Sequence, residues 1–130
     1  MTGGGRAGGA RARGRAAEAA AAAWLEGQGY AVLARNHTTR RGEVDLVCRD
    51  GEAVVFVEVR SRSRIDYGTL AASVGAFKAR RVIAAARDWA VRNGGLSQAM
   101  RFDVVAVDLS GATPRFTLFR NAFDDEGQPM

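Results

Sequence analysis

The stretch that decides the fold is residues 42–62, GEVDLVCRDGEAVVFVEVRSR. It contains two runs rich in valine and other β-formers, and Asp50-Gly51 separates them. A two-residue Asp-Gly pair between two such runs is the strongest short-range signal for a β-hairpin. The stretch therefore predicts two adjacent antiparallel strands, 43–49 and 53–60, joined by a turn at Asp50-Gly51.

Outside the hairpin, the chain alternates between helical and strand patterns. The expected helices cover 15–27, ended by glycines, and 74–92, ended by Asn93-Gly94-Gly95. The second has an apolar stripe at helical spacing: Val82, Ile83, Ala86, Trp89 and Ala90. The other expected strands are 30–36, 101–109 and 114–122. The order α-β-β-β-α-β-β predicts an α/β domain in which helices flank a central mixed sheet.

The expected hairpin turn also fixes which carboxylates lie close together. It places Glu43 opposite Glu58, and Asp45 on the same face as both. Arg60 lies at the edge of this acidic patch, because it is two residues beyond Glu58 on the same strand. The other face carries valines and leucine and is predicted to be core.

Like charges directly opposed across a sheet are destabilising, so Glu43 and Glu58 need an explanation. Three explanations are a bound cation, a proton shared by the two carboxylates, and a compensating arginine. The fourth alternative is a solvated acidic face with Arg41 and Arg60 as counter-ions. The sequence leaves all four open.

Composition limits the kinds of metal site that the chain can build. It has 130 residues, 19 of them basic and 14 acidic, with one Cys and one His. One Cys excludes an internal disulfide, and the low Cys and His counts exclude a zinc site of the usual ligands. Any metal would be held by carboxylate and carbonyl oxygens, as Mg²⁺ or Mn²⁺ are. The net charge of +5 suits a polyanionic partner.

The remaining segments bear on location and domain boundaries. No run of 18 apolar residues is present, so no membrane span is expected, and the alanine-rich segment that contains Glu18 and Glu26 is unlike a signal peptide. We expect a cytoplasmic protein with Cys48 reduced and buried. The predicted domains are a disordered Gly/Arg-rich tail at 1–13, one domain at 14–122 and a short acidic tail at 123–130. His37 has no partner pattern and is interpreted as a loop residue.

Two segments within this framework resemble a known family. Gly-Glu-Val-Asp-Leu at 42–46 and Val-Phe-Val-Glu-Val-Arg-Ser-Arg at 55–62 resemble the PD-(D/E)xK nuclease superfamily. The match is closest to the bacterial YraN-type proteins, which look like archaeal Holliday-junction resolvases. The resemblance extends to segments 14–18, 78–81, 101–107 and 120–123, and it implies a restriction-endonuclease-like fold.

The resemblance also implies roles for individual residues. Asp45 and Glu58 correspond to the metal-binding carboxylates, with the backbone carbonyl of Val59 as a third oxygen. Glu18 corresponds to a helix-borne carboxylate that assists the metal site, and Glu43 belongs to the YraN-type pattern around it. Phosphodiester hydrolysis needs a nucleophilic water and stabilisation of charge on the phosphate, and a carboxylate-held Mg²⁺ or Mn²⁺ supplies both.

Position 60 departs from the superfamily pattern, which has lysine there. Arg60 can bind phosphate, but its pKa above about 12 prevents it from acting as a general base. Lys78 is the only lysine in the chain, and it lies in the second expected helix. We hypothesise that Lys78 points toward the carboxylate patch and partly replaces the missing lysine; the alternative is a surface lysine without a role.

Basic residues flank the acidic patch on both sides in sequence. The predicted nucleic-acid contacts are Arg40, Arg41, Arg62, Arg64, Lys78 and Arg81. A basic rim around an acidic centre is typical of metal-dependent nucleases, because the rim positions the backbone and contacts to phosphate carry no base sequence information. The alternative is a solvated arginine-rich surface.

Three functions remain open from the sequence. The first is a nucleic-acid-binding, metal-dependent endonuclease acting on structured or branched DNA. For such an enzyme the resolvase resemblance implies a homodimer. The second is an inactive binding module of the same fold, because Arg60 replaces lysine. The third is a protein-interaction scaffold.

Overall fold

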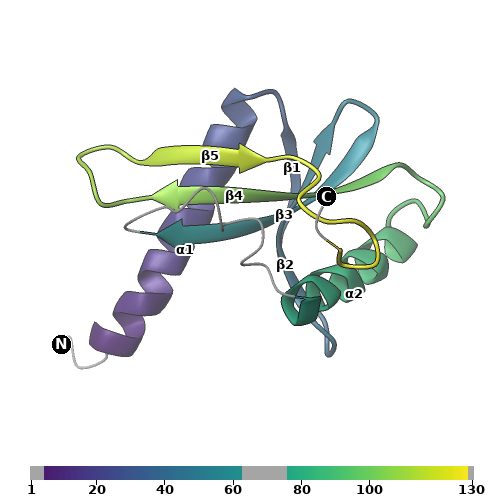
Figure 1. Ribbon diagram of the computed structural model, residues 1–130, viewed down its shortest axis with the longest axis horizontal. Coiled ribbons are helices and arrows are strands. Elements are labelled where there is room, and N and C mark those ends of the chain that lie inside the picture. Colours follow the sequence, from purple (N-terminus) through teal and green to yellow (C-terminus); the bar gives the residue numbers. More distant parts are fainter. Residues whose placement is uncertain (1–4, 63–75, 129–130) are drawn as a thin grey trace.

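The computed structural model describes residues 5–62 and 76–128, and its elements follow the predicted order (Figure 1). They are α1 (Gly5–Gly27), β1 (Ala31–Thr38), β2 (Glu43–Asp50), β3 (Ala53–Arg62), α2 (Ala76–Arg92), β4 (Met100–Asp108) and β5 (Arg115–Phe119). The α/β class and the mixed sheet flanked by helices are confirmed, and the architecture is compatible with a restriction-endonuclease-like fold.

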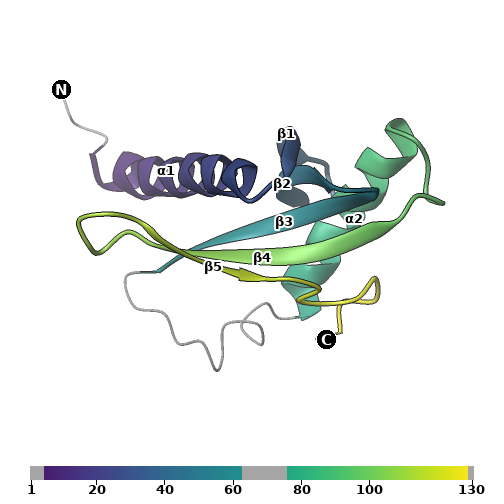
Figure 2. The same ribbon diagram turned by 90° about the horizontal axis from the view of Figure 1, so that it is seen from above.

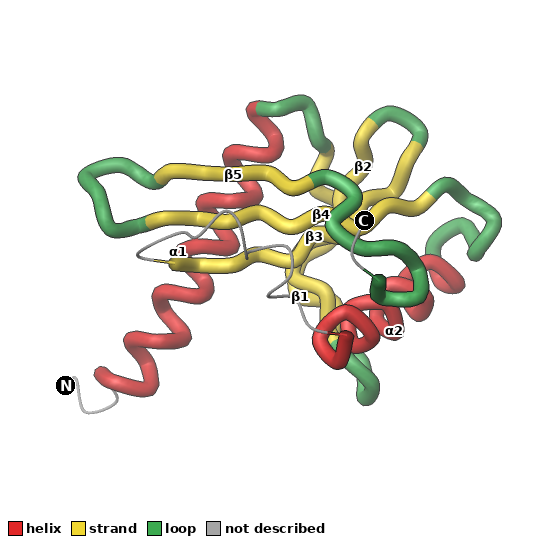
Figure 3. Tube along the Cα trace, in the orientation of Figure 1, coloured by secondary structure: helices red, strands yellow, loops and turns green. Residues whose placement is uncertain are grey.

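The five strands lie in the sheet in chain order, β1-β2-β3-β4-β5. β3 and β4 are parallel, and all other neighbours are antiparallel, as the arrows in Figure 1 show. Figure 3 shows the same strands in yellow and the two helices in red. A parallel pair needs a crossover connection, and α2 lies in the segment that joins β3 to β4. This connection carries α2 to one face of the sheet.

The two helices cover opposite faces, so the protein has a helix–sheet–helix arrangement (Figure 2). Alternation along β3 divides the core: Phe56 packs in the cluster under α2, and Val57 packs in the cluster under α1. The predicted stripe of α2 is buried throughout, and Cys48 is buried under α1, as expected.

The hairpin turn is one residue later than predicted. Asp50 still pairs with Ala53, so the turn residues are Gly51 and Glu52. Gly51 has φ of 61°, which suits the first central position of a type II′ turn, where glycine is preferred. The predicted pair of Glu43 with Glu58 is therefore wrong. Alternation along β3 is as predicted, because every partner moves by two residues and two is the period of a strand. The prediction of a single core face is wrong, because both faces of the hairpin are buried and β2 changes side at Asp45.

The chain ends also differ from the prediction. α1 begins at Gly5, so residues 5–13 of the predicted tail are helical. Their alanines and arginines are strong helix formers, and an existing helix extends more easily than a new one nucleates. Phe123, assigned to the acidic tail, is buried and stacks on Phe102 with ring centroids 5.1 Å apart. A domain boundary at residue 14 stays a prediction, and the predicted α2 start at residue 74 lies outside the described residues.

Candidate functional site

The site lies where β2 and β3 separate. Their ladder ends at the pair Leu46–Val57, while β2 continues along β1 to Glu43 and β3 continues along β4 to Arg62. Continuing the ladder would place Asp45 opposite Glu58. Instead, the Asp45 carboxylate bridges the gap, because its Oδ2 accepts a hydrogen bond of 2.8 Å from the Val59 amide. We call this place the fork.

A break in strand alternation accompanies the fork. Val44 packs in the cluster under α2, and Leu46 packs in the cluster under α1, although residues two apart on a regular strand share a face. The change of side falls at Asp45. The irregular backbone therefore aims this carboxyl group into the gap between the strands.

Three carboxyl groups from three elements meet at the fork. Asp45 forms side-chain hydrogen bonds with Glu18 of α1 and with Glu58 of β3. The Glu58 residue is only 3% exposed. Burial, followed by the charge of Asp45 and its hydrogen bond, raises the pKa of Glu58 to about 8, against the opposing effect of Lys78. Burial and Asp45 also raise the pKa of Glu18.

Two cations approach Glu58 from different elements. Lys78 Nζ, from the first turn of α2, lies 3.2 Å from Glu58 Oε2, and Arg60 Nε lies 3.8 Å from the same oxygen. Lys78 therefore points toward the carboxylate patch, as hypothesised. Its side chain is 41% exposed against 20% for Arg60, so the ammonium of Lys78 is the more accessible to a ligand.

Sequence reasoning missed Asn36. It lies between the β1 residues that pair with Val44 and Leu46, hence across from Asp45, and it hydrogen-bonds the Glu18 carboxyl group. Its φ is 52°, in the left-handed region that asparagine tolerates better than most residues. The bond to Asn36 lowers the pKa of Glu18 and partly opposes burial. An isolated asparagine at the end of a strand pattern gave no signal of this role.

The other predicted residues lie around this cluster. Glu43 is exposed, and its charge adds to the effects that raise the pKa of Glu18. Arg40 and Arg41 are exposed in the β1–β2 turn, and Arg81 of α2 donates a hydrogen bond of 3.5 Å to the Arg41 carbonyl. Only the backbone of Arg62 is described, in β3, and Arg64 lies outside the described residues.

The donor set limits which metal the fork could take. Within residues 5–62 and 76–128, no group of three or more His, Cys, Asp or Glu side chains is placed to hold a metal ion. Asp45 and Glu58 therefore offer two carboxylates, to which the Val59 carbonyl could add an oxygen. Mg²⁺ is commonly bound through one or two carboxylates while keeping several waters, so this set fits Mg²⁺ or Mn²⁺ better than a fully caged ion.

His37 departs from the prediction of a loop residue. It lies within β1, and its Nε2 is 2.8 Å from Asp88 Oδ2 on α2. The hydrogen bond between them links the edge strand of the sheet to the helix that covers it. Among the described residues, no helix is long and apolar enough to cross a membrane.

The fold and the fork define a class: a small mixed α/β protein in which acidic residues of a helix and two strands converge where the sheet divides. The chain belongs to the UPF0102 family, whose model, described as "Uncharacterised protein family UPF0102", matches residues 17–107. This match includes Glu18, Asp45, Glu58 and Lys78, and it confirms the predicted YraN-type resemblance.

Individual relatives match along most of their length. The chain is 62% identical to a UPF0102 protein of Anaeromyxobacter sp. (strain Fw109-5), over 96% of this chain and 94% of that protein. It is 58% identical to one of Anaeromyxobacter dehalogenans (strain 2CP-C), over 97% and 94%. A relative from Geobacter sulfurreducens is 45% identical over 80% and 82%.

Proposed function

We propose that this protein binds nucleic acid and hydrolyses phosphodiester bonds in structured or branched DNA, with Mg²⁺ or Mn²⁺ at the fork. The observation that carries the proposal is the convergence of Glu18, Asp45 and Glu58, which leaves a buried Glu58 with a pKa of about 8. A protein gains no stability from two adjoining carboxylates at a buried position. A divalent cation between Asp45 and Glu58 would remove this cost by displacing the proton.

Asp45 and Glu58 would hold the cation. When bound, the cation would neutralise charge on the phosphate and acidify a water. Asp45 Oδ2 accepts from the Val59 amide, which fixes the carboxylate at the fork. Glu18, which interacts with Asp45 and Asn36, is the group to which we assign the acceptance of a proton from water.

Lys78 supplies the lysine that position 60 lacks. Its ammonium lies beside Glu58, so a phosphate at the fork would come within reach of a mobile primary amine. Unlike Arg60, a lysine shifts its pKa readily and can transfer a proton. Arg60 then acts as a fixed positive charge that binds phosphate.

The basic rim supports nucleic acid as the substrate. Arg40, Arg41 and Arg81 lie together at the β1–β2 turn, on the chain that leads into Asp45. Such contacts act on the backbone and select shape rather than sequence. The resolvase resemblance adds branched DNA as the shape and a homodimer as the assembly. The cytoplasm remains the location that the sequence patterns favour.

The test is cleavage of labelled linear, flapped and four-way DNA, and of RNA, by the full chain in Mn²⁺ or in EDTA. Asp45→Asn and Glu58→Gln should each reduce cleavage at least about 100-fold, because they remove the charge that holds the cation. Glu52→Gln, an equal charge change in the exposed hairpin turn, is the control and should keep full activity. Equal cleavage by all variants, or in EDTA, would refute the proposal.

A second candidate is a binding module without hydrolysis. It is favoured by the Lys78–Glu58 ion pair, which already places a positive charge on the carboxylate that a cation would need. This candidate predicts salt-sensitive DNA binding that is equal in Mn²⁺ and EDTA, without cleavage. Absence of any nucleic-acid affinity would leave the interaction scaffold.

A further inference from the structure

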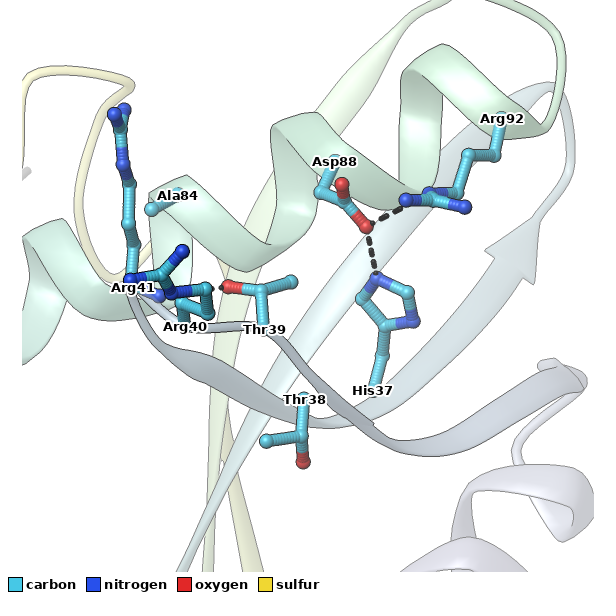
Figure 4. Close-up of a pocket in the computed structure, with 8 residues that line it drawn as sticks. All are labelled: His37, Thr38, Thr39, Arg40, Arg41, Ala84, Asp88 and Arg92. Atoms are coloured by element: carbon cyan, nitrogen blue, oxygen red, sulfur yellow. Dashed lines mark hydrogen bonds and ion pairs between the residues drawn. The ribbon is translucent and has the colours of Figure 1, made fainter.

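A cavity of about 660 Å³ lies apart from the carboxylate cluster, between β1, the β1–β2 turn and the second half of α2 (Figure 4). The side chains that carry its chemistry are His37, Thr39, Arg40, Arg41, Asp88 and Arg92. They come from two segments that are far apart in sequence, residues 37–41 and 84–92. The cavity is concave and predominantly basic, which is the form of an anion site.

The charges around the cavity leave a positive balance. Three arginines, Arg40, Arg41 and Arg92, line the cavity together with one acid, Asp88. Hydrogen bonds from His37 and Arg92 hold the pKa of Asp88 below its usual range, so this group is ionised. Asp88 Oδ2 receives both donors, His37 Nε2 at 2.8 Å and Arg92 Nε at 3.1 Å. The carboxylate thus fixes one wall, and Arg40 and Arg41 supply the excess charge.

The opposite wall is held rigidly. In the β1–β2 turn, the Thr39 hydroxyl oxygen accepts hydrogen bonds from the amides of Arg41 and Gly42, and the Thr39 amide bonds to the Gly42 carbonyl at 2.7 Å. Gly42 lies against the Arg81 backbone so closely that a Cβ there would clash. The turn that carries the two arginines is therefore ordered before any ligand binds, which lowers the entropic cost of binding.

Short stretches of chain join the cavity to the fork. Arg41 and Asp45 are four residues apart, a span of at most about 14 Å on an extended chain. Along α2, Lys78 and Asp88 are ten residues apart, which is about 15 Å at 1.5 Å per residue. Both spans are short enough for one nucleic-acid strand to contact the cavity and the fork together.

We infer that this cavity is a second phosphate site, which holds a backbone phosphate of the same nucleic acid that the fork contacts. The inference rests on the proposed function for its ligand. Its shared chemistry, a phosphate group held by arginines, also fits a free mononucleotide or inorganic phosphate. The experiment therefore includes these ligands as separate arms.

His37 is the only histidine of the chain, so its imidazole protons give isolated NMR signals at the wall of the cavity. We would titrate the full chain, in EDTA, with a 12-base-pair duplex, with a mononucleotide and with inorganic phosphate. The duplex should shift the His37 signals at concentrations at least about tenfold below those that the small ligands need, because only the duplex also contacts the fork and its rim.

Matched variants locate the effect. Arg40→Gln and Arg41→Gln should each weaken the duplex-induced shift several-fold and reduce its salt dependence by about one phosphate contact. Arg87→Gln makes the same charge change at an exposed position of α2 outside the cavity and should leave the shift unchanged. The dispersion of the remaining proton signals shows that each variant is folded.

The outcomes separate this inference from the proposed function. Asp45→Asn and Glu58→Gln should retain the duplex-induced His37 shift, so a chain that binds in this way but never cleaves refutes only the proposed hydrolysis. If the small phosphates move His37 and the duplex does not, the cavity serves a small ligand and the inference is wrong. It is also wrong if no ligand moves His37, or if Arg87→Gln has the same effect as Arg40→Gln.

Discussion

Two buried carboxylates lie on neighbouring strands at the same level of the sheet but have opposite surroundings. Asp103 pairs in register with Val57, and Glu58 pairs with Val104, so the two acids face opposite sides. Asp103 is fully buried and receives hydrogen bonds from the Tyr30 hydroxyl, from the Arg101 guanidinium and from the Asn121 amide. Glu58 is equally inaccessible, but its partners include a second carboxyl group, that of Asp45.

Asp103 therefore stabilises the fold, whereas ionised Glu58 destabilises it. The charge of Asp103 is matched within the protein, because Arg101 also bonds Tyr30 and Asp50 and ties β4 to the start of β1 and the end of β2. Ionising Glu58 in the folded protein is unfavourable, as its raised pKa shows. Burial alone therefore does not identify a functional acid; its neighbours do.

The largest expected effect comes from breaking the matched site. Asp103→Ala leaves the Arg101 guanidinium partly buried without its main partner and should lower the free energy of unfolding by about 3–5 kcal/mol. Urea unfolding followed by circular dichroism measures this. Glu52→Ala, at the exposed turn, should change stability by less than about 0.5 kcal/mol. A loss below about 1 kcal/mol for Asp103→Ala would mean that the network does not stabilise the fold.

The next largest effect concerns Glu58, where the wild-type acid itself lowers stability once it ionises. Because its pKa is raised in the folded state, its contribution to stability is present at acidic pH and lost as pH rises through about 8. Wild-type protein without metal should therefore lose about 2–3 kcal/mol, relative to Glu58→Gln, between pH 6 and pH 9. Urea unfolding at each pH gives the difference. Parallel pH profiles for the two proteins would show that Glu58 titrates normally.

Adding a divalent cation sharpens this experiment. Mg²⁺ at pH 8–9 should recover much of the stability lost by the wild type, because it binds the folded chain with release of the Glu58 proton. Glu58→Gln should gain little from Mg²⁺. Equal gains in both proteins would place the cation elsewhere.

A smaller effect distinguishes the two cations beside Glu58. Lys78→Gln should raise the pKa of Glu58 by about one further unit, because an opposite charge at hydrogen-bond distance favours the ionised form. Arg60→Gln should raise it less, since Nε lies 3.8 Å away. Carboxyl ¹³C NMR titration measures both. A larger shift for Arg60→Gln would make position 60 the main partner of the acid.

The smallest effect concerns Asn36. Asn36→Ala forces a side chain with a Cβ to keep φ of 52° without a hydrogen bond to Glu18, and should cost about 1 kcal/mol. Asn36→Gly relaxes the backbone but also loses the bond, so comparing the two isolates the strain. Both should raise the pKa of Glu18. An unchanged Glu18 pKa would remove Asn36 from the site.

The sequence predicted the element order and the alternation along β3, because both depend on local periodicity. It did not predict that β2 changes side at Asp45, so that both faces of the hairpin are core. It misplaced the turn by one residue, because Asp50 is kept in the ladder and bonds Arg101, which is 51 residues away. The start of α1 was missed because glycine content suggested disorder, although alanine and arginine favour helix.

For the candidate site, too, some features could be predicted from the sequence and others could not. The sequence motif named Glu18, Asp45, Glu58 and Lys78, and the structure brings these four together. The fork could not be foreseen, since it depends on β1 holding one strand while β4 holds the other. The His37–Asp88 contact was equally hidden, because 51 residues separate its partners.

The bridge at the fork gives the protein an internal reporter. The Val59 amide proton is held by a side chain, Asp45, where a ladder partner would normally hold it. Its exchange with solvent deuterium therefore follows the motions of one carboxylate rather than the opening of the whole sheet. A group that clamps Asp45 should slow this exchange while leaving the neighbouring strand amides unaltered, so one backbone proton records how often the two strands part.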